Sequence, residues 1–98
     1  MKAQIFNTRM WLNGTQESSI KKVVSDMLET SGFTILSFVE YKFLPVGYTA
    51  LWLLAESHCA LHTFPEENKS YIELSSCNEN MYLSFCGKCS MLNVLHCP

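Results

Sequence analysis

Long apolar runs, clusters of like charge and low-complexity segments are all missing from this chain of 98 residues. Its longest apolar stretches fall well short of the roughly 18 residues that a membrane-spanning helix needs. Seven Lys and Arg against nine Asp and Glu give a net charge of −2, without the basic cluster that nucleic-acid binding requires. The composition therefore predicts neither a membrane protein nor a nucleic-acid-binding protein.

The N-terminus also lacks the charged, apolar and small-residue order of a secretory signal. The chain has five cysteines, an odd number: Cys59, Cys77, Cys86, Cys89 and Cys97. Without a secretory context they are expected to be thiols, not a disulfide framework. The cytoplasm is the expected location.

A chain of this length predicts one domain, residues 1–98, near the lower size limit for independent folding. Such a domain buries a modest core. A second subunit is therefore expected to contribute one side of an active site that is enclosed on several sides.

Apolar periodicity and turn residues predict an α+β fold. A helix is indicated by one apolar stripe, ended at Gly32 and composed of Ile20, Val23, Val24, Met27 and Leu28. Thr15 or Ser18 can cap the start of this helix. Strands are expected over residues 3–12, 33–43, 48–55, 59–64 and 70–76, with a weak helical tendency over 80–85. The order predicts a two-layer sandwich, an antiparallel β-sheet covered on one face by helix.

Glu56, Ser57 and His58 form a polar step between two apolar strand segments. Strand interiors disfavour such residues, because buried polar groups need partners. A Ser, His, Cys and Glu cluster gathered there would suit nucleophilic catalysis. Satisfied polar core residues are the alternative.

The residues around this step resemble the signature of prokaryotic S-adenosylmethionine decarboxylases. The resemblance rests on Leu54-Ala55-Glu56-Ser57-His58, on Leu61-His62-Thr63-Phe64-Pro65-Glu66, on Cys77 and on the upstream run Phe43-Leu44-Pro45-Val46-Gly47-Tyr48-Thr49. It extends over residues 31–77, about half of the chain.

The resemblance implies an enzyme that makes its own cofactor, a covalent pyruvoyl group, by autocatalytic cleavage between Glu56 and Ser57. The zymogen would become a β chain, residues 1–56, and an α chain, residues 57–98. His62 would assist this processing and Thr49 would support it. The pyruvoyl group derived from Ser57 would form a Schiff base with the substrate, and Cys77 would be the proton donor after loss of CO₂.

For the substrate, the resemblance implies S-adenosylmethionine, a small molecule, with Phe43 stacking on adenine and Glu66 holding the ribose. The product, decarboxylated S-adenosylmethionine, is the aminopropyl donor for spermidine and other polyamines. A homodimer of αβ protomers is implied, with no metal, no nucleic acid and no membrane.

The remaining candidates have plainer interpretations. His58 is expected to be hydrogen-bonded beside the cut, Cys59 to be a small core residue, and Glu73 to be a satisfied strand carboxylate. A metal knuckle is outlined by Cys86, Cys89, His96 and Cys97. A loosely packed or redox-sensitive tail is the preferred interpretation of that segment.

The sequence departs from the family pattern at two places. The first strand lacks the His and the acidic residue that are usual in the family. The usual amphipathic helix after the cysteine that matches Cys77 is not expected in this chain either. These departures leave two alternatives open. One is a pyruvoyl-dependent ornithine or arginine decarboxylase, and the other is an unprocessed homologue that binds and regulates a true decarboxylase.

Overall fold

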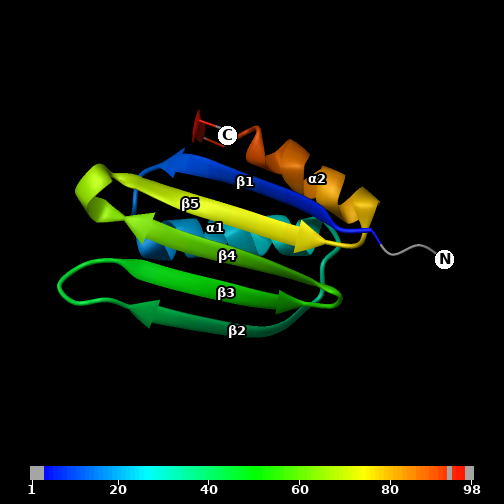
Figure 1. The fold of residues 1–98 in the computed structure, drawn as a ribbon, viewed down its shortest axis with the longest axis horizontal. Coiled ribbons are helices and arrows are strands. Elements are labelled where there is room, and N and C mark those ends of the chain that lie inside the picture. Colours follow the sequence, from blue (N-terminus) through cyan, green and yellow to red (C-terminus); the bar gives the residue numbers. More distant parts are fainter. Residues whose placement is uncertain (1–3, 93, 97–98) are drawn as a thin grey trace.

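One antiparallel sheet of six strands forms the framework of the protein (Figure 1). The computed structural model describes residues 4–92 and 94–96. Along the chain the elements are β1 (Phe6–Asn13), α1 (Glu17–Thr30), β2 (Ile35–Lys42), β3 (Tyr48–Leu54), β4 (Ser57–Phe64), η1 (Pro65–Glu67), β5 (Lys69–Ser76), α2 (Glu79–Cys89) and β6 (Val94–His96). The strand order across the sheet is β2-β3-β4-β5-β1-β6.

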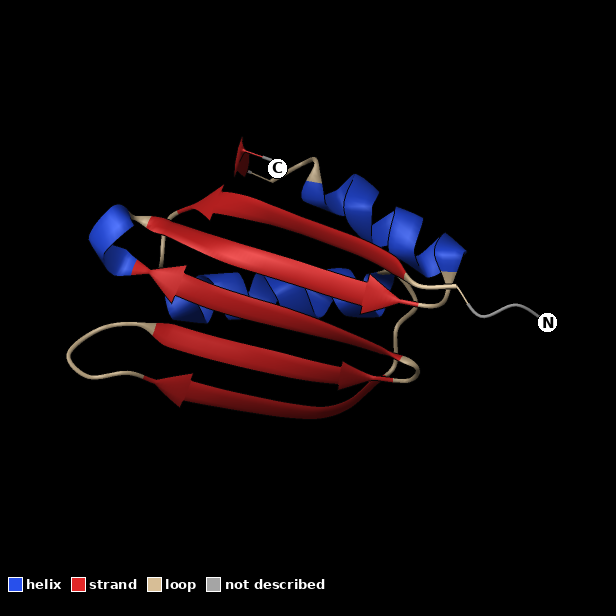
Figure 2. Cartoon of the chain, viewed as in Figure 1, coloured by secondary structure: helices blue, strands red, loops and turns tan. Residues whose placement is uncertain are grey.

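Both helices pack on the same hydrophobic core, and α1 lies behind the sheet (Figure 2). The predicted stripe of α1 is buried at Val24, Met27 and Leu28, whereas Val23 is 38% exposed at its edge. Helix α1 ends at Thr30, and Gly32 follows with a φ of 102°. A glycine accepts this left-handed conformation without strain, as expected for a helix C-terminus.

The strands alternate between the core and an open face, which is the face of the sheet turned away from α1. In β3 the side chains of Tyr48, Ala50, Trp52 and Leu54 are buried, while those between them are partly or fully exposed. Trp52 donates from Nε1 to the hydroxyl of Ser25 on α1 at 3.0 Å. The expected two-layer α+β sandwich with helix on one face is therefore confirmed.

Several predicted elements were wrong in detail. Glu56 lies in a two-residue turn between β3 and β4, and Ser57 and His58 already belong to β4, so the polar step does not interrupt a strand. Gln16, not Thr15 or Ser18, precedes the first turn of α1, and it makes no side-chain cap. Strand β6 was not expected.

The segment after Cys77 contains a full helix, contrary to expectation. Asn78 accepts a hydrogen bond from the backbone N–H of Met81 at 2.9 Å and so caps the start of α2. Phe85 and Cys89 are almost fully buried in the core. Local periodicity was weak because few apolar side chains of α2 face the core, and tertiary packing stabilises the helix instead.

Candidate functional site

A tight hairpin turn presents the Glu56–Ser57 peptide bond at one end of the sheet. Leu54 of β3 faces Ser57 of β4 in the register, so Ala55 and Glu56 alone connect the two strands. Glu56 has a φ of 58°, a left-handed conformation that costs a non-glycine residue about 1–2 kcal/mol. The backbone is therefore strained on the acyl side of this bond.

Two side chains at the C-terminal end of β5 contact the two residues joined by this bond. The Cys77 thiol donates to the carbonyl oxygen of Glu56 at 3.0 Å. The Ser57 hydroxyl donates to the hydroxyl of Ser76 at 2.9 Å. Glu56, Ser57, Ser76 and Cys77 are together called the cleavage cluster below. Of the predicted site residues, the structure brings Glu56, Ser57 and Cys77 together here.

Thr49 and His62 form a second contact near the opposite end of the sheet. They face each other across β3 and β4, and the Thr49 hydroxyl shares a hydrogen bond of 2.9 Å with Nδ1 of His62. A hydrogen bond at Nδ1 restricts the orientation of the ring. His62 is also stacked on Tyr71 of β5, with ring centroids 6.2 Å apart.

Strand register places these side chains in one row across the open face. The row runs over five strands and consists of Trp11, Tyr71, His62, Thr49 and Tyr41. Burial raises the pKa of Tyr71, and the nearby carboxylate of Glu73 raises it further. The Trp11 ring lies 5.2 Å from that of Tyr71. Sequence reasoning missed Tyr71 and Trp11, although strand alternation and pairing could have found them.

Phe43 and Glu66 lie at the same end of the sheet as His62. Phe43 is in the loop between β2 and β3, where its ring is 4.9 Å from that of Tyr41 and 49% exposed. Glu66 is exposed on η1, which directly follows β4. Phe43, Thr49, His62 and Glu66 are called the histidine cluster below.

The two clusters are far apart within one chain. Ser57 and His62 are separated by five positions on β4, which corresponds to about 16 Å along a strand. They also point to opposite faces, because side chains alternate along a strand. Figure 1 shows the turn between β3 and β4 at one end of the sheet, and η1 with the β2–β3 loop at the other. Within one chain, His62 therefore does not join the cleavage cluster.

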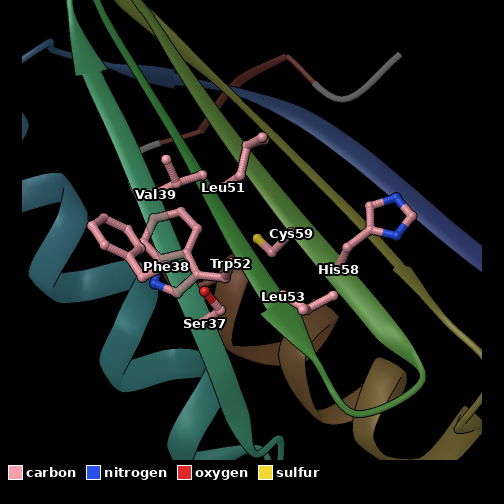
Figure 3. Close-up of a pocket in the computed structure, with 8 residues that line it drawn as sticks. All are labelled: Ser37, Phe38, Val39, Leu51, Trp52, Leu53, His58 and Cys59. Carbon is pink, nitrogen blue, oxygen red and sulfur yellow. The ribbon is translucent and has the colours of Figure 1, made fainter.

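A mainly apolar hollow lies over β2, β3 and β4. Its volume is about 380 Å³, and it is lined by Ser37, Phe38, Val39, Leu51, Trp52, Leu53, His58 and Cys59. Figure 3 shows Phe38 and Trp52 on the side of α1, and Val39 and Leu51 pointing away from that helix. Val39, Leu51 and Leu53 are 60%, 46% and 55% exposed. The open face therefore presents a substantial apolar surface at β2 and β3.

The other candidate residues take structural positions. Cys59 is fully buried, as predicted for a core residue, and burial raises the pKa of its thiol. Glu73 is half-buried on the open face, opposite Ala60 and Arg9 in the register. His58 is exposed on the open face, and its side chain makes no hydrogen bond to another described residue, so the hydrogen bond expected beside the cut is wrong.

The segment interpreted as a loosely packed tail is well packed in its described part. Cys86 and Cys89 lie on α2, and Cys89 is 1% exposed in the core. The side chain of His96 and the whole of Cys97 lie outside the described residues. Over residues 4–92, no three His, Cys, Asp or Glu side chains gather in a way that could hold a metal ion. Among the described helices, none is both long and apolar enough to cross a membrane.

Comparisons with known proteins point to one family. The sequence model described as S-adenosylmethionine decarboxylase matches residues 13–87. A proenzyme of that name from Prochlorococcus marinus (strain MIT 9211) is 33% identical over 63 residues, 64% of this chain and 52% of the relative. The proenzyme from Brevibacillus brevis is 37% identical over 62 residues, 63% of this chain and 47% of the relative. The chain thus spans about half the length of the curated relatives it matches.

A solved structure shares the fold. The crystal structure of the adenosylmethionine decarboxylase from Aquifex aeolicus VF5 superposes with a TM-score of 0.77 at 22% sequence identity, over 100% of this chain and 88% of that one. At this identity the likeness shows the fold alone.

Proposed function

Because this chain belongs to the S-adenosylmethionine decarboxylase family, we propose that it is a self-cleaving, pyruvoyl-dependent decarboxylase whose cofactor comes from Ser57. The observation that carries the proposal is the hydrogen bond of 3.0 Å that the Cys77 thiol donates to the carbonyl oxygen of Glu56. A donor at that oxygen stabilises the negative charge that develops when the carbonyl is attacked.

Cleavage begins with attack of the Ser57 oxygen on the Glu56 carbonyl carbon. The peptide C–N bond breaks, the hydroxyl proton passes to the freed amine, and an ester joins the two residues. Removal of the α-proton of Ser57 then breaks its Cβ–O bond, which releases the Glu56 carboxylate and leaves dehydroalanine. Water hydrolyses the imine form of that residue, ammonia leaves, and a keto group remains at position 57.

The strained turn favours this sequence of steps. Glu56 has a φ of 58°, and breaking the bond after it releases the turn from that conformation. The products are residues 1–56 and 57–98, which remain associated because β3 and β4 are paired over their whole length. The residues present thus fit a cofactor made in place.

A pyruvoyl group at position 57 supplies a carbonyl that condenses with an amino acid's amine and withdraws electrons as CO₂ leaves. The chain must then return a proton to the substrate carbon. Cys77 is suited to this role because its thiol is exposed and lies against residue 56, next to the reacting position.

S-adenosylmethionine is the proposed substrate, and its decarboxylated product would serve as aminopropyl donor in polyamine synthesis. Phe43 offers a half-exposed ring, braced by Tyr41, on which an adenine can stack. Glu66 is an exposed carboxylate at the same end of the sheet, suited to accept hydrogen bonds from ribose hydroxyls. The names of the matched relatives support the same substrate.

Two copies of the chain are needed to complete the site. The cleavage cluster and the histidine cluster are about 16 Å apart along β4. A second copy that packs its own open face on the open face of the first, with the strands running in opposition, would bring its histidine cluster to the end of the sheet where the β3–β4 turn carries the Glu56–Ser57 bond. A two-fold axis then produces two equal sites, each built from both chains.

The apolar part of the open face supports this dimer. Val39, Leu51 and Leu53 are each about half exposed or more, and they lie on the same side of neighbouring strands β2 and β3. Adjacent apolar side chains of this size are typical of a surface that a partner covers. We also propose a cytoplasmic location, which the free thiols of the four described cysteines support.

The intact mass of the purified protein under denaturing, reducing conditions tests cleavage. We expect two fragments that meet between Glu56 and Ser57, the second bearing a keto group in place of its amine. The Ser57→Ala variant should stay intact. A wild-type chain that stays uncut after long incubation would contradict the proposal and favour a regulatory homologue.

Release of CO₂ from carboxyl-labelled substrates tests the second half of the proposal. The cleaved protein is offered S-adenosylmethionine, ornithine and arginine separately, with Ser57→Ala as the blank. We expect release from S-adenosylmethionine. Release only from ornithine or arginine would retain the pyruvoyl chemistry and overturn the substrate.

A further inference from the structure

We propose that Ser76 is a positioning residue for self-cleavage, which holds both the attacking hydroxyl of Ser57 and the turn that carries Cys77. The inference rests on the proposed function and assigns a role within the same site. It arises from hydrogen bonds that meet at one buried oxygen atom.

Ser76 is the last residue of β5 and is 1% exposed. It faces Ser57 directly in the β4–β5 register, and its hydroxyl oxygen accepts from the Ser57 hydroxyl at 2.9 Å. The same oxygen accepts from the backbone N–H of Asn78 at 3.0 Å. A hydroxyl can accept two hydrogen bonds, so both lone pairs of this oxygen are used.

The first bond sets the direction of the nucleophile. A serine hydroxyl is otherwise free to rotate among three staggered positions. Because the Ser57 hydrogen points at Ser76, the lone pairs of the Ser57 oxygen are turned away from that residue and remain available for attack. Without Ser76, the hydroxyl would sample other rotamers, or would donate to a group that diverts it from the carbonyl.

The second bond sets the position of the carbonyl donor. Cys77 lies between Ser76 and Asn78, so the contact from Ser76 to the Asn78 N–H closes a small turn around it. The thiol at the tip of that turn donates to the Glu56 oxygen. One buried oxygen therefore fixes the attacking atom and the donor on the attacked group relative to each other.

If Ser76 had a purely structural role, its substitution would have a different effect on the rate of cleavage. Asn78 already caps α2 through Met81, independently of Ser76. If Ser76 served only to order this junction, its loss would lower stability and leave the rate of cleavage unchanged. Ser75 provides the matched control, because it is the same residue type one position earlier and bonds to Asn7 instead.

The test follows cleavage of the full chain after a short pulse of cell-free synthesis, by the masses of the chain and its fragments over time. We expect Ser76→Ala to slow cleavage about tenfold, which corresponds to the loss of one positioning hydrogen bond. Ser76→Thr, which keeps the hydroxyl, should stay within about threefold of wild type. Ser75→Ala should cleave at the wild-type rate.

Hydroxylamine distinguishes positioning from a fault in a later step, because it cuts esters but not amides. Ser76→Ala should remain uncut in hydroxylamine, since formation of the ester is the step that slows. Ser76→Cys, with nearly the same volume and a weaker acceptor, should behave similarly if Ser76→Ala does not fold.

Cleavage of both Ser76→Ala and Ser76→Cys at the wild-type rate would overturn the inference. Rapid cutting of the slow variants by hydroxylamine would overturn it as well, because the ester would then form normally. A wild-type chain that is never cut is a different outcome, which contradicts the proposed function itself.

Discussion

The two ends of the sheet are held in different ways. At the cleavage cluster, the side chains of Ser57, Ser76 and Cys77 are hydrogen-bonded within the same chain: Ser57 to Ser76, Ser76 to the backbone of Asn78, and Cys77 to the backbone of Glu56. At the histidine cluster, Thr49 and His62 are bonded to each other and face outward, while Phe43 and Glu66 are largely exposed. At one end the reacting bond is preorganised by contacts within the chain. At the other end the groups are exposed and available to contact a second copy of the chain or the substrate.

This difference explains why one small domain can carry both halves of a site without completing either. The reacting bond must be fixed before reaction, because misplacement by about 1 Å costs rate heavily. The assisting groups are placed equally well by a second copy, provided that its sheet packs at a fixed register. Variants at each end of the sheet show whether the two clusters act separately, together or across two chains.

The largest expected effect is complementation between two inactive chains. The His62→Ala chain keeps the Glu56–Ser57 bond and its attacking hydroxyl but lacks the histidine that assists cleavage. The Ser57→Ala chain keeps that histidine but lacks the attacking hydroxyl. We expect each to stay uncut alone and the His62→Ala chain to be cut when the two are coexpressed, because the partner supplies His62. Fragment masses identify which chain is cut. An uncut mixture that forms mixed dimers would show that the ends do not meet between copies.

The next effect concerns the apolar surface between the ends. Leu53→Glu places a charge in the proposed interface, where its burial is unfavourable. We expect a monomer by sedimentation at micromolar concentration, and a loss of most cleavage. Leu83→Glu is the matched control, because Leu83 is 56% exposed on α2 and distant from the open face. A monomeric Leu53→Glu chain that cleaves normally would contradict the shared site.

A smaller effect is expected within the histidine cluster. Thr49→Val keeps the shape of the side chain and removes the hydrogen bond to Nδ1 of His62. We expect cleavage to slow about three- to tenfold, the rate equivalent of roughly 1 kcal/mol. Thr49→Ser should restore most of the rate, as time courses of fragment formation would show. Equal rates for all three chains would mean that the ring is oriented by Tyr71 stacking alone.

The smallest effect is on stability and is confined to the turn. In an uncleavable Ser57→Ala background, Glu56→Gly should stabilise the chain by about 1 kcal/mol, because glycine adopts a positive φ without strain. Asn68→Gly is the comparison, since Asn68 has a similar φ of 52° but Asn tolerates it better. Urea unfolding measures both. A larger gain at Asn68 than at Glu56 would argue against stored strain at the scissile bond.

The α+β class, helix α1 and the central strands followed from the sequence, because their apolar residues recur with clear periods. The motif indicated Glu56, Ser57 and Cys77, three of the four residues of the cleavage cluster. The match to the family confirms the resemblance but leaves each residue's role to experiment. For α2 the sequence indicated only a weak helical tendency over residues 80–85, because its apolar residues make a weak stripe, and contact with the core at Phe85 and Cys89 shows why the full helix forms.

What the sequence determined by itself is local: which segments are strands, that Gly32 follows the end of helix α1, and which residue types the cleavage chemistry requires. Tertiary structure decided which of those residues meet. Ser76 became relevant only when β5 paired with β4 and placed its hydroxyl opposite Ser57. His62 was separated from Ser57 for the same reason, because a paired strand is extended, and five positions along it span about 16 Å and change the face.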